Sequence, residues 1–282
     1  MSIPVAFNDI GKPSKDLLSK DYPIDGIKVE VKTSAFDGTT FKVNGHRDNN
    51  LGIIAGDIET KYVDKQNGIV LTQAWTTSNI LNGKIELENN LAKGLKLELL
   101  TSYLPITHGK TIKINTIHKQ PNVHSTASVD LSKLVFSANS VYGQEGFLIG
   151  AEVAYNAKLA KVSNYNAAIG YSARQYAVAL HATNSLSRYA ASYYQRLDES
   201  LEATAKADWD KKTNTIGLEA GAKMVLDSTS FVKGKVTNTG IVGISYTQLI
   251  RPGIKANLGF AADSARLNEN AYKVGLTLTF EN

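Results

Sequence analysis

The chain has 282 residues, of which 43% are hydrophobic, 20% are charged and none is cysteine. This composition excludes an intrinsically disordered chain, disulfide bonds and sites that depend on thiolates. The net charge of +5 comes from basic residues spread along the chain without a dense cluster, which argues against nucleic-acid binding. The longest apolar runs are short, such as residues 53–55, so a transmembrane helix is excluded. A transmembrane strand is not excluded, because it needs only every second residue to be apolar.

Residues 1–25 differ in pattern from the rest, and we predict that they form an amphipathic helical segment. Four apolar residues fall on one side of the helical wheel, namely Phe7, Ile10, Leu17 and Leu18. Gly11 and Pro13 predict a break or kink in the middle of this helix. The helix can be a surface helix on a soluble core or a mobile helix inside a pore. The start of the chain carries neither a secretory signal pattern nor, given Asp9 and Asp16, a matrix-type transit peptide.

Residues 26–282 form the second predicted domain, in which the hydrophobic period changes from 3.6 to 2. Alternating segments of about nine residues suit tilted membrane strands. About nineteen such segments begin near residues 27, 40, 54, 69, 80, 95, 111, 122, 134, 147, 164, 175, 188, 201, 215, 231, 241, 254 and 271. Turn signals such as Asp37-Gly38 separate them, and no proline interrupts an alternating run. We therefore predict an all-β, up-and-down barrel whose odd strand number makes the first and last strands parallel.

The two phases of the alternating segments differ in chemistry. The apolar phase mixes small residues with aromatic residues near strand ends, which is typical of a lipid-facing wall with aromatic girdles. These aromatics are Tyr62, Trp75, Tyr103, Tyr142, Tyr155, Tyr171, Tyr193 and Trp209. In the other phase Lys and Arg outnumber Asp and Glu, so a pore lined by it favours anions modestly, because water and salt screen its walls over about 8 Å. The alternative is a soluble sandwich that has ordinary aromatic enrichment in its strands.

No motif in the sequence points to catalysis. The five histidines show no metal-ligand spacing, and no nucleophile elbow, phosphate-binding loop or dinucleotide fingerprint is present. Glu86 and Glu88 lie two apart and share a strand face, which suits either an acid/base pair or a solvated pore wall. We favour the pore wall, and we predict no enzymatic activity, no cofactor and no metal site.

Several motifs along the chain carry a family resemblance. They lie at the head, middle and tail of the sequence and comprise residues 7–12, 16–18, 20–22, 68–75, 91–96, 231–236, 246–248 and 251–253. With them the chain resembles the voltage-dependent anion channel, or mitochondrial porin, family along its whole length. The resemblance implies nineteen strands closed by a parallel pair, a lumenal N-terminal helix and a multi-pass protein of the mitochondrial outer membrane. It also implies voltage-dependent closure and the passage of ATP, ADP and other anionic metabolites.

The resemblance and the charge pattern together suggest site residues. The predicted set for pore lining, voltage sensing and nucleotide contact comprises Lys12, Lys15, Asp16, Lys20, Lys61, Lys84 and Lys96. A second stretch matches a family segment associated with nicotinamide nucleotides and comprises Ile241, Val242, Gly243, Gly259, Phe260, Ala261, Ala262 and Asp263. Gln73 stands where many animal members have a lipid-facing glutamate, so regulation through that acid is not expected here. Pro13 is a second departure from the family pattern.

The predicted function is a voltage-gated, weakly anion-selective diffusion channel for small metabolites. One alternative is the barrel subunit of the outer-membrane protein translocase, although its N-terminal extension is longer than residues 1–25. A soluble lipid-binding or anion-binding sandwich is the other. Expected partners are membrane lipid, anionic metabolites and nucleotides. The sequence leaves open a homo-oligomer and docking proteins from the cytosol.

Overall fold

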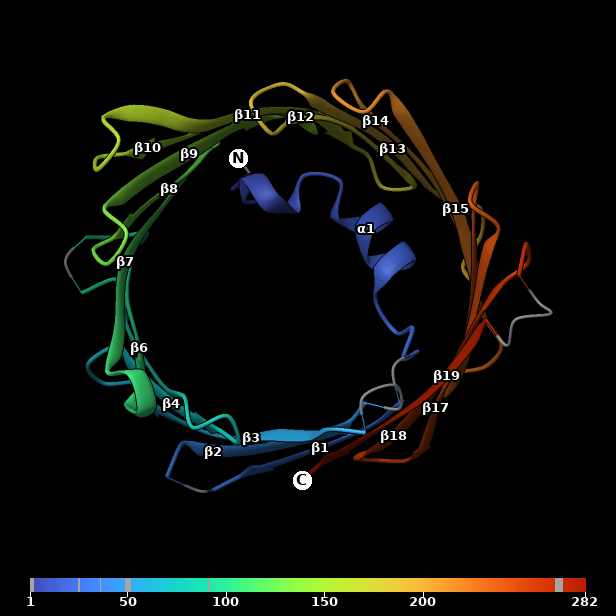
Figure 1. The fold of residues 1–282 in the computed structure, drawn as a ribbon, viewed down its shortest axis with the longest axis horizontal. Coiled ribbons are helices and arrows are strands. Elements are labelled where there is room, and N and C mark those ends of the chain that lie inside the picture. The colour runs from blue at the N-terminus through green and yellow to red at the C-terminus, as the bar shows by residue number, and fades with distance from the viewer. Residues whose placement is uncertain (1–2, 25, 36, 49–51, 91, 267–270) are drawn as a thin grey trace.

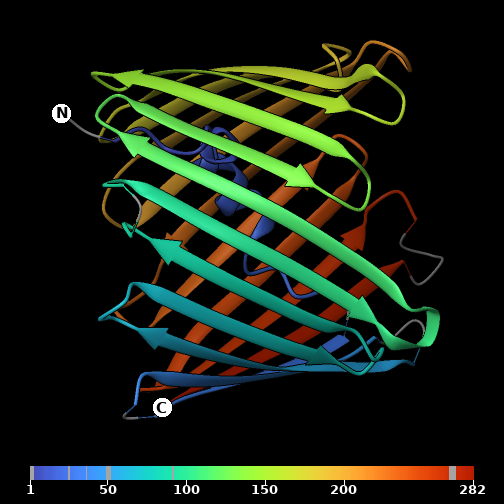
Figure 2. The same cartoon turned by 90° about the vertical axis from the view of Figure 1, so that its left-hand side faces the viewer.

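Nineteen strands in the described part of the chain form one closed sheet around a wide lumen (Figure 1). The structure is a computed structural model, and it describes residues 3–24, 26–35, 37–48, 52–90, 92–266 and 271–282. Each strand pairs with its neighbours in sequence, and the strands run obliquely around the barrel wall (Figure 2). The predicted up-and-down order is therefore confirmed.

The strand bounds agree closely with the predicted starts. The strands are β1 (Gly26–Ser34), β2 (Thr39–Arg47), β3 (Ile54–Asp64), β4 (Ile69–Thr76), β5 (Leu81–Glu88), β6 (Leu95–Leu104), β7 (Gly109–Gln120), β8 (Val123–Asp130), β9 (Val135–Gln144), β10 (Phe147–Asn156), β11 (Lys161–Ser172), β12 (Tyr176–Thr183), β13 (Arg188–Arg196), β14 (Leu201–Asp210), β15 (Thr215–Val225), β16 (Ser230–Thr237), β17 (Ile241–Arg251), β18 (Ile254–Asp263) and β19 (Tyr272–Glu281). The largest disagreement is at the start of β11, which is predicted near residue 164 and lies at Lys161. There Ala154 pairs with Asn164 but Tyr155 pairs with Val162, so an extra residue in a bulge interrupts the alternation.

The barrel closes through a parallel pair. Strands β1 and β19 run in the same direction, in a register that pairs Gly26 with Gly275 and Lys32 with Glu281. The other eighteen strand pairings are antiparallel. An odd number of strands in a closed meander requires one parallel contact, and closure leaves no unpaired sheet edge. The predicted parallel closure is confirmed.

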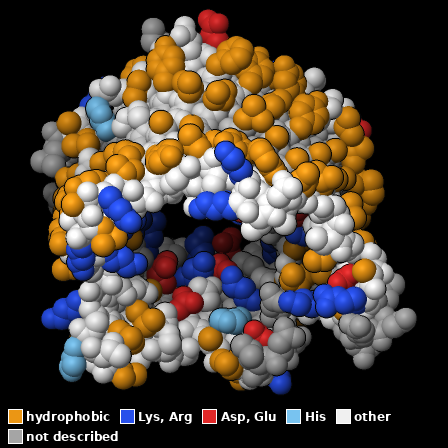
Figure 3. All heavy atoms as spheres, turned by 45° about the horizontal axis from the view of Figure 1, so that its top comes forward, with side chains coloured by type: hydrophobic (Ala, Val, Ile, Leu, Met, Phe, Trp, Pro, Cys, Tyr) orange, Lys and Arg blue, Asp and Glu red, His pale blue; other side chains and the backbone are white. Residues whose placement is uncertain are grey.

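The outer wall is apolar and the lumen is charged. Large apolar side chains such as Ile58, Trp75 and Ile169 are more than half exposed on the outer face. The space-filling view shows hydrophobic side chains over the outer surface and charged ones around the opening (Figure 3). Exposed apolar area of this extent is unfavourable in water and is expected where the surrounding medium is lipid.

The N-terminal segment lies inside the barrel (Figure 1). It contains a short 3-10 helix, η1 (Phe7–Asp9), followed by the helix α1 (Lys12–Ser19). The predicted apolar face is confirmed, because its four members, Phe7, Ile10, Leu17 and Leu18, are 3–4% exposed.

The break between η1 and α1 differs in detail from the prediction. Ile10 ends η1, and Gly11, in the left-handed conformation with φ of 73°, is the N-cap of α1. Pro13 does not break α1 but lies in its first turn, where a missing N–H leaves no intrahelical hydrogen bond unmade. No helix in the described part of the chain is long and apolar enough to cross a membrane.

Candidate functional site

An apolar contact fixes the start of the N-terminal segment against the barrel wall. Phe7 and Ile10 form a buried cluster with Val141, Ala168 and Ala179 of the wall. A Cβ atom at Gly150 would lie 2.8 Å from the Phe7 ring. The absence of a side chain at Gly150 therefore makes room for Phe7 against the wall. Further along, the hydroxyl groups of Ser14 and Thr204 are hydrogen-bonded at 2.6 Å, and both residues are buried.

Two histidines of the wall hold carbonyl groups of the same segment. His124 Nδ1 lies 3.1 Å from the carbonyl oxygen of Pro4, and His181 Nε2 lies 3.1 Å from that of Ile10. Each ring nitrogen must donate in this contact, because a carbonyl oxygen only accepts. The segment is therefore tied to β8 and β12 by polar contacts as well as by its apolar face.

Lys233 of β16 binds the C-terminal end of α1. Its ammonium donates to the carbonyl oxygens of Asp16 and Lys20, at 3.4 and 3.2 Å, and to the Asp21 carboxylate at 2.9 Å. It also lies 5.7 Å from the Phe231 ring centroid. The carbonyl groups at the end of a helix carry partial negative charge, which the Lys233 ammonium stabilises. The Asp16 carbonyl also accepts the N–H of Lys20, whereas the Lys20 carbonyl lies beyond this last intrahelical hydrogen bond.

Lys235, two residues further along β16 and on the same face, also contacts the end of α1. Its ammonium donates to the carbonyl oxygen of Leu18 at 2.7 Å and to the Glu219 carboxylate at 3.2 Å. The same ammonium lies 4.8 Å from the centroid of the Tyr22 ring. Burial, with the charges of Glu219 and Asp21, raises the pKa of Tyr22 above its ordinary value, so its hydroxyl stays neutral.

The Asp21 carboxyl is the acidic partner of this anchor. Burial by itself raises its pKa, but the hydrogen bond and charge of Lys233, with the charge of Lys255 at 3.6 Å, outweigh burial. The pKa of Asp21 is therefore held below its ordinary value, and the carboxylate is ionised at neutral pH.

Two of the three predicted lysines of the N-terminal segment are paired with carboxylates of that segment. Lys12 lies 3.0 Å from Asp9, and Lys20 lies 2.7 Å from Asp16. The hydrogen bond and charge of Asp9 raise the pKa of Lys12. Among the described residues, no carboxylate lies within ion-pair distance of Lys15. Lys15 therefore supplies the uncompensated charge of the helix.

The predicted wall lysines Lys84 and Lys96 belong to a four-membered charge cluster on β5 and β6. Lys84 pairs with Glu86 and, at 3.3 Å, with Glu98; Lys96 pairs with the same two acids at 3.1 and 3.0 Å. Asn115 donates to Glu98 at 3.2 Å. The cluster contains two positive and two negative charges. Its lysines are therefore neutralised mainly by Glu86 and Glu98.

Lys61 stands apart from both groups. It lies on β3, in register with Thr40 and Thr72, and no described carboxylate is within ion-pair distance of it. The predicted residues thus form three groups, on α1, on β5–β6 and on β3.

A crevice of about 500 Å³ separates α1 from the wall. Its charged and titratable lining residues include Lys15, Glu152, His181, Arg188, Lys206 and Asp208. Lys206 and Arg188 share Asp208, at 2.7 and 3.7 Å. Its size suits a small metabolite, and its basic side chains suit an anionic one.

The predicted stretch on β17 and β18 is divided between the two faces of the wall. The strand register places Val242 opposite Ala262 and Ile244 opposite Phe260 on the outer face. A Cβ atom at Gly259, on the lumenal face, would collide with the backbone of Pro23, so the N-terminal linker covers this glycine. Nucleotide binding by the stretch stays a prediction.

Sequence reasoning missed the anchors of the helix. Strand alternation places Lys233 and Lys235 in the lumenal phase, but no local signal shows that they meet the end of α1. His124 and His181 carried no signal at all, because their partners are backbone carbonyl groups far away in the chain. In the described residues no three His, Cys, Asp or Glu side chains gather in a way that could hold a metal ion.

Comparisons with known proteins agree with this architecture. A family profile described as eukaryotic porin matches residues 3–275. The mitochondrial outer membrane protein porin of Neurospora crassa is 41% identical over 285 residues, with all of both chains covered. That of Candida albicans is 39% identical over 98% of this chain and 99% of its own. The human non-selective voltage-gated ion channel VDAC2 is 31% identical over 100% of this chain and 96% of its own.

Solved structures show a similar fold. A variant of the Rh. blastica porin aligns with a TM-score of 0.52 and 10% identity, covering 83% of this chain and 96% of that chain. At this identity the likeness concerns the fold alone. The family match and the relatives, by contrast, extend over nearly the whole sequence, and the chain belongs to the eukaryotic porin family.

Proposed function

We propose that this barrel is a voltage-gated, weakly anion-selective diffusion channel for small metabolites in the mitochondrial outer membrane. The observation that carries the proposal is a closed nineteen-stranded wall, apolar outside and charged inside, around a lumen that holds one helix. Barrels of sixteen to eighteen strands already leave an aqueous channel. The full-length relatives bear the names of a mitochondrial porin and of a voltage-gated ion channel, which supports the channel over the translocase alternative.

The anion preference follows from the lumenal charges. Basic side chains outnumber acidic ones in the lumenal phase, but several are balanced by nearby carboxylates, as on β5 and β6. Water and salt screen the remaining excess over about 8 Å. The channel therefore prefers anions without excluding cations, and it passes ATP, ADP and inorganic anions by diffusion, without a catalytic step or a cofactor.

Gating requires charge to move through the membrane field. Each elementary charge that crosses 100 mV contributes about 2.3 kcal/mol. Going from tenfold open to tenfold closed takes about 2.7 kcal/mol. At about 50 mV, two to three charges must cross. We propose that the predicted lysines of α1 and of the wall supply them, with Lys15 and Lys61 prominent because neither is paired with a described carboxylate.

The partners proposed for this channel are membrane lipid, anionic metabolites and nucleotides. Lys12 and Lys20 are proposed to contact nucleotides transiently, exchanging their helix carboxylates for phosphate groups. A homo-oligomer and cytosolic docking proteins belong to the same proposal.

A planar bilayer with a salt gradient tests this function. Refolded protein is expected to give large conductance steps that fall to substates at both polarities, with a reversal potential on the anion side. Joint charge reversal of Lys12, Lys15, Lys20, Lys61, Lys84 and Lys96 is expected to move the reversal potential to the cation side. An unchanged voltage dependence and selectivity in that variant would refute the assignment of these residues. Absence of conductance from folded barrel would refute the channel.

A further inference from the structure

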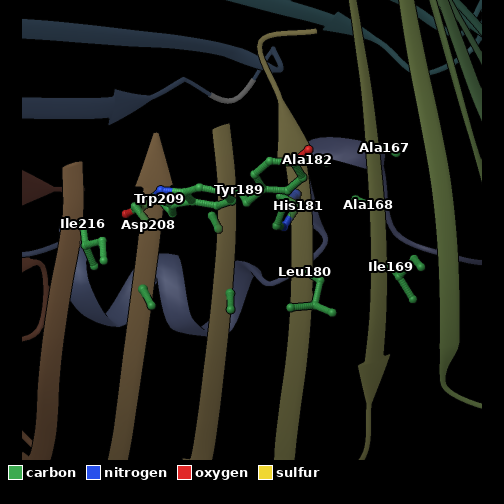
Figure 4. Close-up of a pocket in the computed structure, with 13 residues that line it drawn as sticks. Ala167, Ala168, Ile169, Leu180, His181, Ala182, Tyr189, Asp208, Trp209 and Ile216 are labelled. Atoms are coloured by element: carbon green, nitrogen blue, oxygen red, sulfur yellow. The ribbon is translucent and has the colours of Figure 1, made fainter. Parts of the chain in front are cut away.

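The lipid-facing wall contains a hollow that the channel function does not use. It has a volume of about 390 Å³ and lies over β11 to β15 (Figure 4). Its small lining residues on the outer face are Ala167, Ala182, Ala191 and Ala207. Larger apolar side chains flank it, namely Ile169, Leu180, Tyr189, Trp209 and Ile216. A surface of this kind, sunk below its neighbours and lined by apolar side chains, can accept a hydrocarbon chain.

The hollow lies just inside one rim of the barrel. Trp209 and Tyr189 stack beside it with ring centroids 5.5 Å apart and an interplanar angle of 23°. The Trp209 indole donates to the Asn214 side chain at 3.4 Å, which ties the ring to the loop between β14 and β15. Trp and Tyr with one polar end and one apolar face are typical of the level of the lipid headgroups. The hollow therefore starts at headgroup level and runs toward the hydrocarbon.

The loop above the hollow is basic. Lys211 and Lys212 follow β14 directly and are exposed, and no described carboxylate lies within ion-pair distance of either. The adjacent Asp210 instead accepts the backbone N–H groups of Lys212 and Thr213, at 2.8 and 3.4 Å. Its carboxylate shapes the turn, and the two ammonium groups are available to a ligand.

Two further loops at the same rim are basic, beyond the uncharged loop of residues 184–187 between β12 and β13. Lys133 lies in the loop between β8 and β9, and Lys158 lies in the loop between β10 and β11. Leu159, next to Lys158 in the same loop, is 61% exposed. Lysines interleaved with exposed aliphatic side chains at a membrane boundary favour anionic lipid headgroups.

We propose that the hollow and the two lysines above it form a binding site for an anionic phospholipid. One acyl chain lies along the alanines beside Trp209, and the phosphate meets Lys211 and Lys212. The apolar lining stabilises the chain, and the exposed ammonium groups select a negatively charged headgroup over a zwitterionic one. The inference rests on the barrel spanning a membrane, and it does not depend on voltage gating or anion selectivity.

The barrel contains a natural control for this site. The second tryptophan, Trp75, lies beside another hollow, of about 510 Å³, and its indole likewise donates to the side chain of a loop asparagine, Asn79, at 3.2 Å. The loop above that hollow, residues 77–80, carries no charged side chain. The two sites share a tryptophan at the same rim and differ in the lysines.

Tryptophan quenching by brominated lipid tests the proposal. Full-length Trp75→Phe, which retains Trp209, is refolded into phosphatidylcholine vesicles that contain a minor fraction of either brominated phosphatidylglycerol or brominated phosphatidylcholine. At equal bromine content, quenching of Trp209 by the anionic lipid is expected to be about twofold greater or more, and added salt is expected to reduce the difference. In Trp209→Phe, which retains Trp75, the two lipids are expected to quench equally.

Variants separate the two parts of the site. Lys211→Gln with Lys212→Gln, on the Trp75→Phe background, is expected to abolish the preference for the anionic lipid. Lys65→Gln with Lys93→Gln, in loops at the opposite rim, is the matched control and is expected to preserve it. Conductance steps of the parent size verify that each variant has folded. Equal quenching of Trp209 by both lipids, or an unchanged preference in the Lys211 and Lys212 variant, would overturn the proposal whether or not the channel gates.

Discussion

The ammonium of Lys233 lies 2.9 Å from the Asp21 carboxylate, and this ion pair joins β16 to the linker just after the lumenal helix. The lysine side chain is 6% exposed and the aspartate side chain 28%. The same ammonium also binds two carbonyl groups at the end of α1. One side chain therefore contacts both the negative end of the helix dipole and the linker that follows the helix. The position of the helix across the lumen therefore depends on Lys233.

Lys233→Met is expected to loosen α1 without unfolding the barrel. It leaves the Asp21 carboxylate and the Lys20 carbonyl group without their main partner, which costs about 1–3 kcal/mol of docking free energy. The open-state current of single channels should become noisier, with more frequent visits to substates. Lys255→Met removes a longer and more exposed contact with the same carboxylate and should have a smaller effect. Equal noise in Lys233→Met and the parent would show that the anchor does not hold the helix.

Docking of the helix is expected to weaken in acid. Because the pKa of Asp21 in the docked state lies below its ordinary value of 3.8, the ionised carboxylate contributes stability at neutral pH. That contribution stays present down to about pH 4 and is lost as the pH falls through the lowered docked-state pKa. Open-state noise recorded from neutral pH to about pH 3 should rise at the acid end. In Asp21→Asn the noise should be high throughout, and this acid-dependent rise should disappear.

The strands could be predicted because a lipid-facing wall imposes strict alternation. At Tyr272–Glu281, as in most strands, apolar residues alternate with polar ones and a turn precedes them, which sets both span and face. The error at β11 arose because the bulge near Asn164 shifts the phase by one residue, and no side-chain pattern marks that shift. The buried face of the N-terminal segment followed from the same reasoning at the helical period.

The site was less accessible to sequence reasoning. Alternation shows that Lys84 and Lys96 are lumenal, but only the register between β5 and β6 shows that both pair with Glu86 and Glu98. The anchoring by Lys233 joins residues more than two hundred positions apart and uses backbone carbonyl groups, which have no sequence signature. Position in the lumen was therefore predictable, whereas charge compensation was not.

Gly11→Ala is expected to undock the start of α1. Gly11 has a φ of 73°, and an added Cβ would lie 2.9 Å from the Ala179 side chain, so strain and collision act together. The cost is expected to be about 1–2 kcal/mol of docking free energy. Limited proteolysis of refolded protein should then cut the N-terminal segment faster than in the parent. Gly45→Ala, where an added Cβ meets nothing within 4 Å, should leave the cleavage rate unchanged.

Glu98→Gln is expected to make the channel more anion-selective. Glu98 binds Lys84, Lys96 and Asn115, and its loss leaves both lysines with Glu86 as their remaining acid in the cluster. The lumen then carries one more uncompensated positive charge, whose effect on passing ions grows as salt is lowered. The reversal potential in a salt gradient should move further to the anion side, and more so at low ionic strength.

The matched control for Glu98→Gln is Glu145→Gln, which removes the same charge from an exposed turn between β9 and β10. Since bulk water and salt screen a charge at the rim more fully than one in the lumen, its reversal potential should remain close to that of the parent. Equal shifts in the two variants would mean that net charge, and not position in the lumen, sets selectivity. No shift in Glu98→Gln would contradict the prediction, because Glu86 alone cannot neutralise both Lys84 and Lys96.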